Sequence, residues 1–376
     1  MKSKLFHAGR DPDTTEIPDG VTRPQDDPVE VFHPYDLPNA PTVHVPGEVA
    51  SISAAVLELG DHGRVVVAPG SYRENIKIRP GTYIIIQAEG PEHPELFAAE
   101  PKVPVVHIAP GAELHITGMS VNGTKSGLVA GSEATGEAAH AVTLLDTHVA
   151  NAKYGIYGSV TKFNIERSIV ERNVYGMVVA GSTYVANTVI SGNMMNVVLS
   201  GGNIPSCAEA AYDASNGAQV SLKQVTIGYG KKGGLAICNV KSATLDSIYV
   251  IKNGYIGVQI RNTPMFKLTN SNVRETQYLN GEWGDGLVVV KSNGLVKQCQ
   301  FSANKRANMI YYGKSGGTID GNLIIYAVFA IDLEEMDGDC PGPDILGNNC
   351  MYGNTENRVT FGGQLCPIPI PPPPSL

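Results

Sequence analysis

From about residue 105 to residue 350, one pattern of apolar and polar positions recurs along the chain. It can be written apolar–x–x–small/apolar–x–apolar–x–x–Asn–x–x–Gly–apolar–x–apolar. Successive copies are spaced by 28, 21, 20, 37, 23, 23, 28, 23 and 26 residues, so the basal repeat is about 20–23 residues with insertions at a few places. A repeat of this length, built from short alternating strands, predicts a solenoid in which each coil packs only against its neighbours. The third apolar position is filled by Val121, Val149, Val170, Ile190, Ile227, Val250, Val273, Phe301, Ile324 and Cys350.

Two further columns of the repeat predict how each coil turns. A glycine column follows about six residues after the third apolar position; because Gly and Asn tolerate φ > 0, we expect a sharp corner there. An Asn recurs three residues after the same position, where its side chain can bond the backbone of the next coil and form an internal ladder. The first column comprises Gly127, Gly155, Gly176, Asn196, Gly234, Gly257, Gly286 and Asn308, and the second Asn173, Asn193, Asn253 and Asn304.

This frame, with its Asn-bearing turn, resembles the pectin lyase-like superfamily of right-handed parallel β-helices over roughly residues 49–360. The resemblance implies an all-β fold, a right-handed parallel β-helix solenoid. It implies little about activity, because that fold carries lyases, hydrolases, esterases, epimerases and non-catalytic adhesins.

The two ends of the chain differ from the repeat. Residues 1–46 contain eight of the 25 prolines and many Asp, which predicts an extended arm. Residues 47–60 place Val49, Ile52, Val56 and Leu59 at helical spacing, so we expect a capping helix over about 49–60 that covers the open end of the solenoid. The β-helix then runs from 47 to 362, and residues 363–376 form a proline-rich tail.

Charge and hydropathy exclude several classes of function. The formal net charge is −8 and no basic tract is present, so the sequence does not predict nucleic-acid binding. An acidic polymer could be held only by a local patch of Lys and Arg. No run of 18 or more apolar residues occurs, and no secretory signal is visible at the start.

Six cysteines favour an oxidising compartment, and we expect a secreted or cell-surface protein. Cys340 and Cys350 bound a short loop that could be closed by a disulfide. Cys299 falls at an inward position, where a buried free thiol is expected.

Catalytic signatures of the resembled superfamily are absent. The strings nearest to the methylesterase-like and polygalacturonase-like motifs are YGIYGSV at 154–160, which has no carboxylate, and GTIDGN at 317–322, which has only one of the paired Asp required. An epimerase-like YGFDPH does not occur. Candidate sites therefore come from the stacking of positions on successive coils, about 4.8 Å apart.

The first candidate is a trio of polar residues. Asp146 and Arg167 hold the same slot on successive coils, and His148 follows two residues after Asp146. Together they could supply an acid, a base and a cation for uronate chemistry. The competing interpretation is a surface ion pair beside an unrelated His.

The second candidate lies on the strand after the glycine column, whose outward positions are mostly apolar. Arg261 and Gln259 interrupt this strip, and Lys291 lies on a later coil. Lyases of the resembled fold use Lys or Arg as a base on such a strand, which makes Arg261 a candidate catalytic residue. The insertion at 276–285 contains Tyr278 and Trp283, which could stack on sugar rings. The alternatives are that Trp283 anchors its own loop and that the strip is covered by the arm or by a second copy, giving a homo-oligomer.

The third candidate is the acidic run DLEEMDGDCPGPD, in which Asp332, Glu334 and Glu335 could bind Ca²⁺. Its spacing does not match an EF-hand, and a solvated acidic turn is the alternative. No cofactor is otherwise required.

Two functions remain open. One is a carbohydrate-active protein, a lyase or epimerase acting on an acidic polysaccharide. The other is a non-catalytic surface or scaffold protein that uses the β-helix for binding or assembly.

Overall fold

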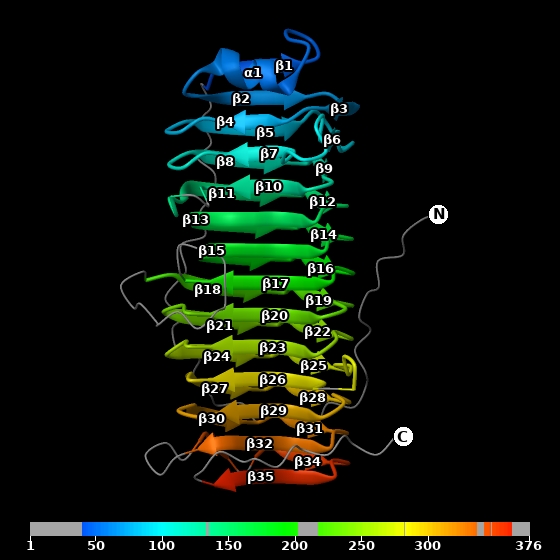
Figure 1. The fold of residues 1–376 in the computed structure, drawn as a ribbon, viewed down its shortest axis with the longest axis vertical. Coiled ribbons are helices and arrows are strands. Elements are labelled where there is room, and N and C mark those ends of the chain that lie inside the picture. The colour runs from blue at the N-terminus through cyan, green and yellow to red at the C-terminus, as the bar shows by residue number, and fades with distance from the viewer. Residues whose placement is uncertain are drawn as a thin grey trace, which may run out of the picture. The chain divides into compact units, whose positions relative to one another are not determined.

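The computed structural model describes residues 40–132, 135–201, 217–281, 283–336, 342–346 and 348–362, apart from the side chains of 335–336 and 357–362. These residues form a right-handed parallel β-helix, in which each strand of a coil stacks on the equivalent strand of the next coil (Figure 1). All strand pairings between coils are parallel, and they build one 23-stranded and one 12-stranded sheet. No helix in this described part of the chain is long and apolar enough to cross a membrane.

Each coil has three faces. The first face contains β1 (Thr42–Val45), β2 (His62–Val67), β5 (Tyr83–Ala88), β8 (Glu113–Thr117), β11 (Ala139–Leu145), β18 (Gln219–Lys223), β21 (Ser242–Asp246), β24 (Met265–Thr269), β27 (Asn293–Lys297), β30 (Gly316–Asp320) and β33 (Asp344–Ile345). The second face contains β3 (Ser71–Arg73), β6 (Glu95–Phe97), β9 (Ser120–Asn122), β12 (His148–Ala150), β14 (Ile169–Glu171), β16 (Val189–Ser191), β19 (Thr226–Gly228), β22 (Tyr249–Ile251), β25 (Asn272–Arg274), β28 (Gln300–Ser302), β31 (Leu323–Ile325) and β34 (Cys350–Tyr352).

The third face completes each coil. It contains β4 (Ile76–Ile78), β7 (Val106–Ile108), β10 (Ser126–Ala130), β17 (Met195–Ser200), β20 (Gly233–Cys238), β23 (Ile256–Arg261), β26 (Asp285–Val290), β29 (Ala307–Tyr312), β32 (Phe329–Met336) and β35 (Glu356–Gly362). Two long strands, β13 (Tyr154–Glu166) and β15 (Tyr175–Ala186), start on the third face and continue onto the first face of the next coil.

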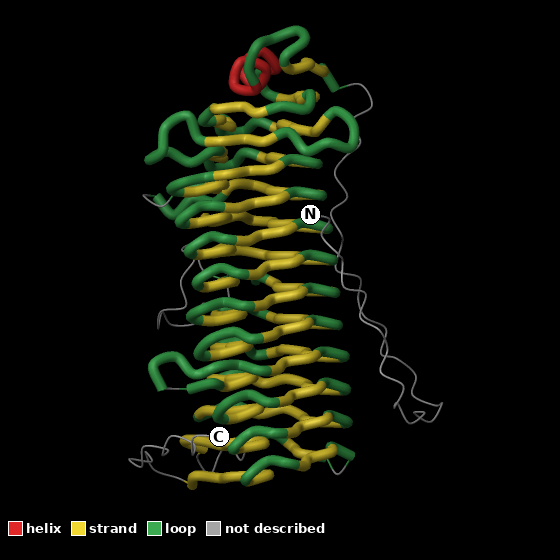
Figure 2. Tube along the Cα trace, turned by 90° about the vertical axis from the view of Figure 1, so that its right-hand side faces the viewer, coloured by secondary structure: helices red, strands yellow, loops and turns green. Residues whose placement is uncertain are grey.

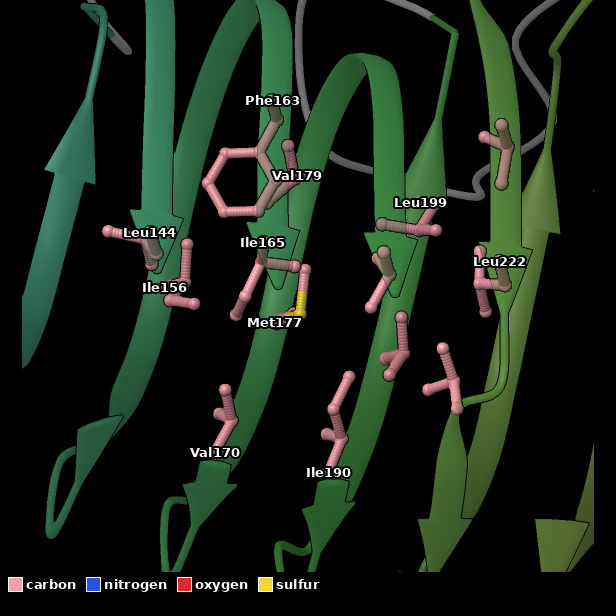
Figure 3. Close-up of a cluster of buried hydrophobic side chains, with 14 of the residues drawn as sticks. Leu144, Ile156, Phe163, Ile165, Val170, Met177, Val179, Ile190, Leu199 and Leu222 are labelled. Carbon is pink, nitrogen blue, oxygen red and sulfur yellow. The ribbon is translucent and has the colours of Figure 1, made fainter. Parts of the chain in front are cut away.

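The predicted inward columns are confirmed by the strand registers. On the second face Val149 pairs with Val121 and Val170, and Val170 pairs with Ile190. All four belong to the core, and Figure 3 shows the side chains of Val170 and Ile190 inside the solenoid with those of the other faces. One assignment is wrong. In the last coil Ile324 pairs with Met351 rather than Cys350, so the column is continued by Met351.

The glycine column does not form the predicted corner with positive φ. Its glycines lie outside the left-handed region, and close packing explains them instead. A Cβ on Gly155 would lie 2.6 Å from the Gly176 carbonyl oxygen and 2.8 Å from Nδ2 of Asn173. Most left-handed residues other than glycine fall one position after a strand of any of the three faces; Asp146 and Arg167, both with φ of 48°, follow first-face strands.

The Asn ladder is confirmed, and it extends beyond the predicted column. Asn173 Nδ2 donates to Asn193 Oδ1 at 3.1 Å, and Asn193 Nδ2 donates to Asn196 Oδ1 at 2.9 Å. The next ladder position is Gly230, and Asn196 spans it by donating to Asn253 Oδ1 at 2.9 Å. An Asn in the glycine column therefore supplies the side chain that the following ladder position lacks.

A short helix covers one end of the solenoid, as the sequence predicts (Figure 2). Helix α1 (Ile52–Leu59) starts after Ser51, whose hydroxyl accepts from the Ala54 N–H at 3.1 Å. The Glu74 carboxylate accepts from the N–H groups of Ile52 and Ser53, at 2.9 and 2.7 Å. Ile52 and Val56 are buried against the core. The first strand, β1, lies inside the range that the sequence assigned to the arm, whose residues 1–39 lie outside the described residues.

The predicted Cys340–Cys350 disulfide is wrong, because Cys350 is a free, exposed cysteine. Cys299 is a buried free thiol, as expected, and burial raises its pKa to about 12. Cys238 is disulfide-bonded.

A candidate active site on the third face

A buried ion pair joins two coils on the outer side of the third face. Arg306 Nε and Nη2 donate to the two carboxylate oxygens of Asp285 at 2.7 and 2.6 Å. The side chains are only 12% and 0% exposed. Burial opposes the charge of Arg306, but the hydrogen bonds and charge of Asp285 outweigh it and raise the pKa of Arg306. Burial also raises the pKa of Asp285, with Arg306 opposing. Each charge offsets the desolvation cost of the other, because a single buried charge without its partner would be strongly destabilising.

Two carboxyl groups lie beside this pair on strand β32. Ile331 and Leu333 belong to the core, so Asp332 and Glu334 alternate onto the outer side. Asp332 is fully buried, and its carboxyl oxygens accept no hydrogen bond from a neighbouring donor; a hydrogen bond to Glu334 forms only when one of the two carboxyl groups holds a proton. Burial first, and then the charge of Glu334, raise the pKa of Asp332 to about 8. At neutral pH this carboxyl pair therefore keeps a proton.

An apolar cluster, separate from the main core, explains the burial. Ala307, Ile310 and Phe329 form it, with Tyr312 packed against it. Ile310 pairs with Asp332, and Tyr312 pairs with Glu334. The Tyr312 hydroxyl lies within hydrogen-bonding range of Glu334 and Arg306, and its pKa is raised by burial and then by Glu334. The hydroxyl thus stays protonated and available as a donor.

The insertion at 276–285 supplies aromatic rings next to Arg306. The guanidinium lies 4.6 Å from the centroid of the Trp283 ring, and Trp283 packs on Tyr255 at 5.4 Å. The Tyr278 hydroxyl donates to the Lys305 carbonyl at 2.8 Å, and its pKa is raised by burial and then by Asp285. Trp283 therefore holds its loop against the ion pair while its side chain stays partly exposed.

The Arg261 group lies on the same surface. Through the registers Arg261–Val290, Val290–Tyr312 and Tyr312–Glu334, Arg261 shares one column with Tyr312 and Glu334. Gln259 shares the neighbouring column with Asp332 in the same way. Arg261 and Gln259 are both partly exposed, and Lys291 lies exposed directly after β26.

The Asp146 trio does not come together. Arg167 Nε and Nη2 donate to Asp146 at 2.9 and 2.8 Å, with side chains that are 51% and 40% exposed. His148 turns instead toward Glu171, at 3.3 Å between Nε2 and Oε1. The geometry is that of two separate surface contacts.

The apolar strip is largely buried within a single chain. Val178, Ala236, Val288 and Ile310 are at most 7% exposed. Little apolar surface is left there for a second copy, so the homo-oligomer stays a prediction.

Within the described ranges, no group of three or more His, Cys, Asp or Glu is arranged to hold a metal ion. Asp332 and Glu334 lie on a strand face rather than in a solvated turn. The Glu335 side chain lies outside the described part of the chain, so the calcium site stays a prediction.

Sequence reasoning missed Asp285 and Arg306. The insertion at 276–285 displaced Gly286 and Asn308 from the repeat frame, and this hid the coil position of the residues before them. A usable signal was present, because Asp285 and Arg306 are 21 residues apart, the same separation as Asp146 and Arg167.

Comparison with known proteins places the fold. No family model matches the chain, and no curated protein sequence does. Among solved structures, the A-module of mannuronan C-5 epimerase AlgE6 from Azotobacter vinelandii matches with a TM-score of 0.54 and 12% identity, over 83% of this chain and 91% of that one. The chain has the pectin lyase-like fold.

Two further structures share this pectin lyase-like fold. A double mutant of the periplasmic alginate epimerase AlgG has a TM-score of 0.57 and 10% identity, over 83% of this chain and 84% of that one. The enzymatically active domain of bacteriophage CBA120 tailspike protein 2 has a TM-score of 0.54 and 12% identity, over 73% of this chain and 44% of that one. Two of these three structures are thus named as alginate or mannuronan epimerases and the third as an enzymatically active domain, and at 10–12% identity their likeness to this chain shows the fold.

Proposed function

We propose that the chain is an enzyme acting on an acidic polysaccharide, as a lyase or an epimerase, at the third face between β23 and β32. The observation that carries the proposal is the carboxyl group of Asp332 beside Glu334, which is fully buried, accepts no hydrogen bond from a neighbouring donor and has a pKa raised to about 8. A buried titratable group whose pKa is shifted by burial and by a specific charged neighbour is a candidate for a functional site.

Lyases and epimerases of uronates share one first step. A base removes the proton from the sugar carbon next to the carboxylate, and the negative charge that develops must be stabilised. The lyase then expels the glycosidic oxygen, whereas the epimerase returns a proton to the opposite side of the carbon.

The residues can be assigned to these needs. The Asp332–Glu334 pair exchanges the proton, and the Tyr312 hydroxyl donates to the leaving oxygen or returns the proton. Arg261, predicted from the sequence as a base, is better suited to bind the carboxylate of another sugar unit of the polymer, because a guanidinium keeps its proton and Arg261 lies three strands from Glu334. Arg306 is neutralised by Asp285, and together with Trp283 it forms the side wall.

Electrostatics set a condition on this arrangement. The charges of Asp285 and Arg306 cancel, and Asp332 is neutral while it holds its proton. Above pH 8 the site gains one negative charge. Acidic substrates should then bind more weakly, and KM should rise.

The test is incubation with polymannuronate and polygalacturonate, followed by three readouts. Ultraviolet absorbance reports unsaturated product, exchange of sugar protons in deuterated water reports epimerisation, and reducing ends report hydrolysis. Asp332→Asn should lower the rate about 10²–10⁴-fold. Asp146→Asn, on an exposed Asp–Arg pair, is the matched control and should leave the rate unchanged.

Each outcome separates the alternatives. Reducing ends without unsaturated product would mean hydrolysis by the carboxyl pair. Binding of polymer with none of the three signals would support the non-catalytic scaffold and overturn the proposal.

Calcium is a separate part of the proposal. The three unpartnered oxygens of Asp332 and Glu334 are suitable ligands, but Ca²⁺ needs six to eight oxygens, so substrate or backbone groups would have to complete the shell. A calcium-dependent rise of the Tm at pH 9, abolished in Glu334→Gln, is the expected result. We also propose a secreted or cell-surface location, because Cys238 is disulfide-bonded.

A further inference from the structure

Three tyrosines form an aromatic cluster on the third face, far from the carboxyl pair. The rings of Tyr154 and Tyr175 stack at 5.0 Å with an interplanar angle of 13°, and Tyr157 packs on Tyr154 at 4.9 Å. All three side chains are partly exposed. Ile156 and Met177, which follow Tyr154 and Tyr175, belong to the core, and Tyr157 alternates to the outer side. The cluster is therefore partly open to solvent, while Tyr154 and Tyr175 stack on each other.

Exposed lysines line one edge of this cluster. Lys153 Nζ lies 5.1 Å from the centroid of the Tyr154 ring. Lys125 precedes the equivalent position one coil earlier, and Lys232 precedes it further along. In a chain with a net charge of −8, this is the local cationic patch that an acidic polymer requires.

The registers place the tyrosines in line with the proposed active site. One column runs through Tyr157, Val178, Val198, Ala236, Gln259, Val288, Ile310 and Asp332, on β13, β15, β17, β20, β23, β26, β29 and β32. Seven steps of ~4.8 Å separate its ends by ~34 Å. A sugar unit in an extended polysaccharide advances by close to one strand spacing. A polymer lying along the third face would therefore reach the tyrosines about seven units from Asp332.

We propose that Tyr154, Tyr157 and Tyr175, with Lys153, form a remote binding subsite for an acidic polysaccharide whose chain also occupies the active site. This inference rests on the proposed function and specifies its substrate: a long polymer is preferred over short oligosaccharides. The tyrosine rings stack on sugar faces, and the lysines pair with the carboxylates.

The test compares substrate length. In the double variant Tyr154→Ala, Tyr175→Ala, KM for polymannuronate should rise about tenfold, whereas KM and kcat for a tetrasaccharide should stay unchanged. Lys153→Met should make polymer binding less dependent on salt. The matched control is Tyr326→Ala with Tyr352→Ala, an exposed tyrosine pair in contact at 5.7 Å on the second face. It should leave both substrates unaffected.

Two results would overturn the inference. Equal losses on polymer and tetrasaccharide would assign the tyrosines a structural role, and no change on either would remove the subsite. Retardation in gels containing polymannuronate measures binding without turnover. If the protein has no activity but the tyrosine variant is no longer retarded, the subsite is supported and the proposed catalysis fails. If the protein is active and the tyrosine variant keeps the same preference for long substrates, the proposed catalysis is supported and the subsite fails.

Discussion

Two Asp–Arg pairs in this molecule have the same chemistry and opposite surroundings. Asp146–Arg167 and Asp285–Arg306 are each separated by 21 residues, and each is bidentate. The first is about half exposed, whereas in the second Asp285 is fully buried and Arg306 is 12% exposed. Sequence spacing alone cannot distinguish them.

Their positions within the coil explain the difference. Asp146 and Arg167 occupy the left-handed turn after a first-face strand, where the side chain leaves the solenoid. Asp285 begins β26 and Arg306 precedes β29, between an apolar cluster and Trp283. Water screens the charges of the first pair, whereas the buried charges of the second pair are compensated only by each other. Only near the second pair does burial shift pKa values far enough for acid–base chemistry.

Removing one partner of the buried pair should have the largest effect on stability. Arg306→Met leaves Asp285 buried without its cation, and we expect the free energy of unfolding to fall by about 3–5 kcal/mol. Chemical denaturation measures this loss. The double variant Asp285→Asn, Arg306→Met should recover part of it, because the uncompensated charge is gone. If Arg306→Met lowers the free energy of unfolding no more than Arg167→Met does, the buried and exposed pairs do not differ in stability and the comparison is wrong.

The carboxyl pair should give the next largest effect, through pH. The pKa of Asp332 is raised to about 8 in the folded state, while an unfolded Asp titrates near ~3.9. The folded state holds a proton that the unfolded state has lost, so this contribution to stability is complete below about pH 4 and is lost as the pH rises to about 8. The change is on the order of a few kcal/mol.

Asp332→Asn should therefore flatten the stability profile between pH 4 and 8, as followed by denaturation at a series of pH values. Asp146→Asn is the control and should leave the profile unaltered. A wild-type profile that rises with pH through this interval would contradict the assignment of the proton to the carboxyl pair.

The exposed pair should give the smallest effect. Arg167→Met should cost at most about 1 kcal/mol of unfolding free energy, and less at high salt, because both charges are solvated. Thermal denaturation at low and high ionic strength measures it. A loss of unfolding free energy comparable to that of Arg306→Met would show that the Asp146–Arg167 pair stabilises the fold as much as the buried pair does.

The repeat made much of the fold predictable. Inward positions recur because every coil must bury the same column, and the Asn ladder recurs because every turn leaves the same backbone groups to satisfy. Where the ladder lacks an Asn, at Gly230, the side chain of Asn196 takes its place. The glycine column was located correctly but for the wrong reason, because crowding by a carbonyl of the next coil cannot be deduced from one coil's sequence.

The candidate site was only partly predictable. Arg261, Trp283, Asp332 and Glu334 were singled out, yet they came from separate hypotheses that the registers join on one face. Asp285 and Arg306 were missed because an insertion shifted the frame.

The sequence by itself determined a parallel β-helix with a capping helix, because period, alternation and turn residues are local properties that each coil repeats. Only the tertiary structure decided which polar residues are buried and which face one another. Burial and pKa shifts depend on what covers a side chain from neighbouring coils and insertions, and a single coil's sequence does not specify that.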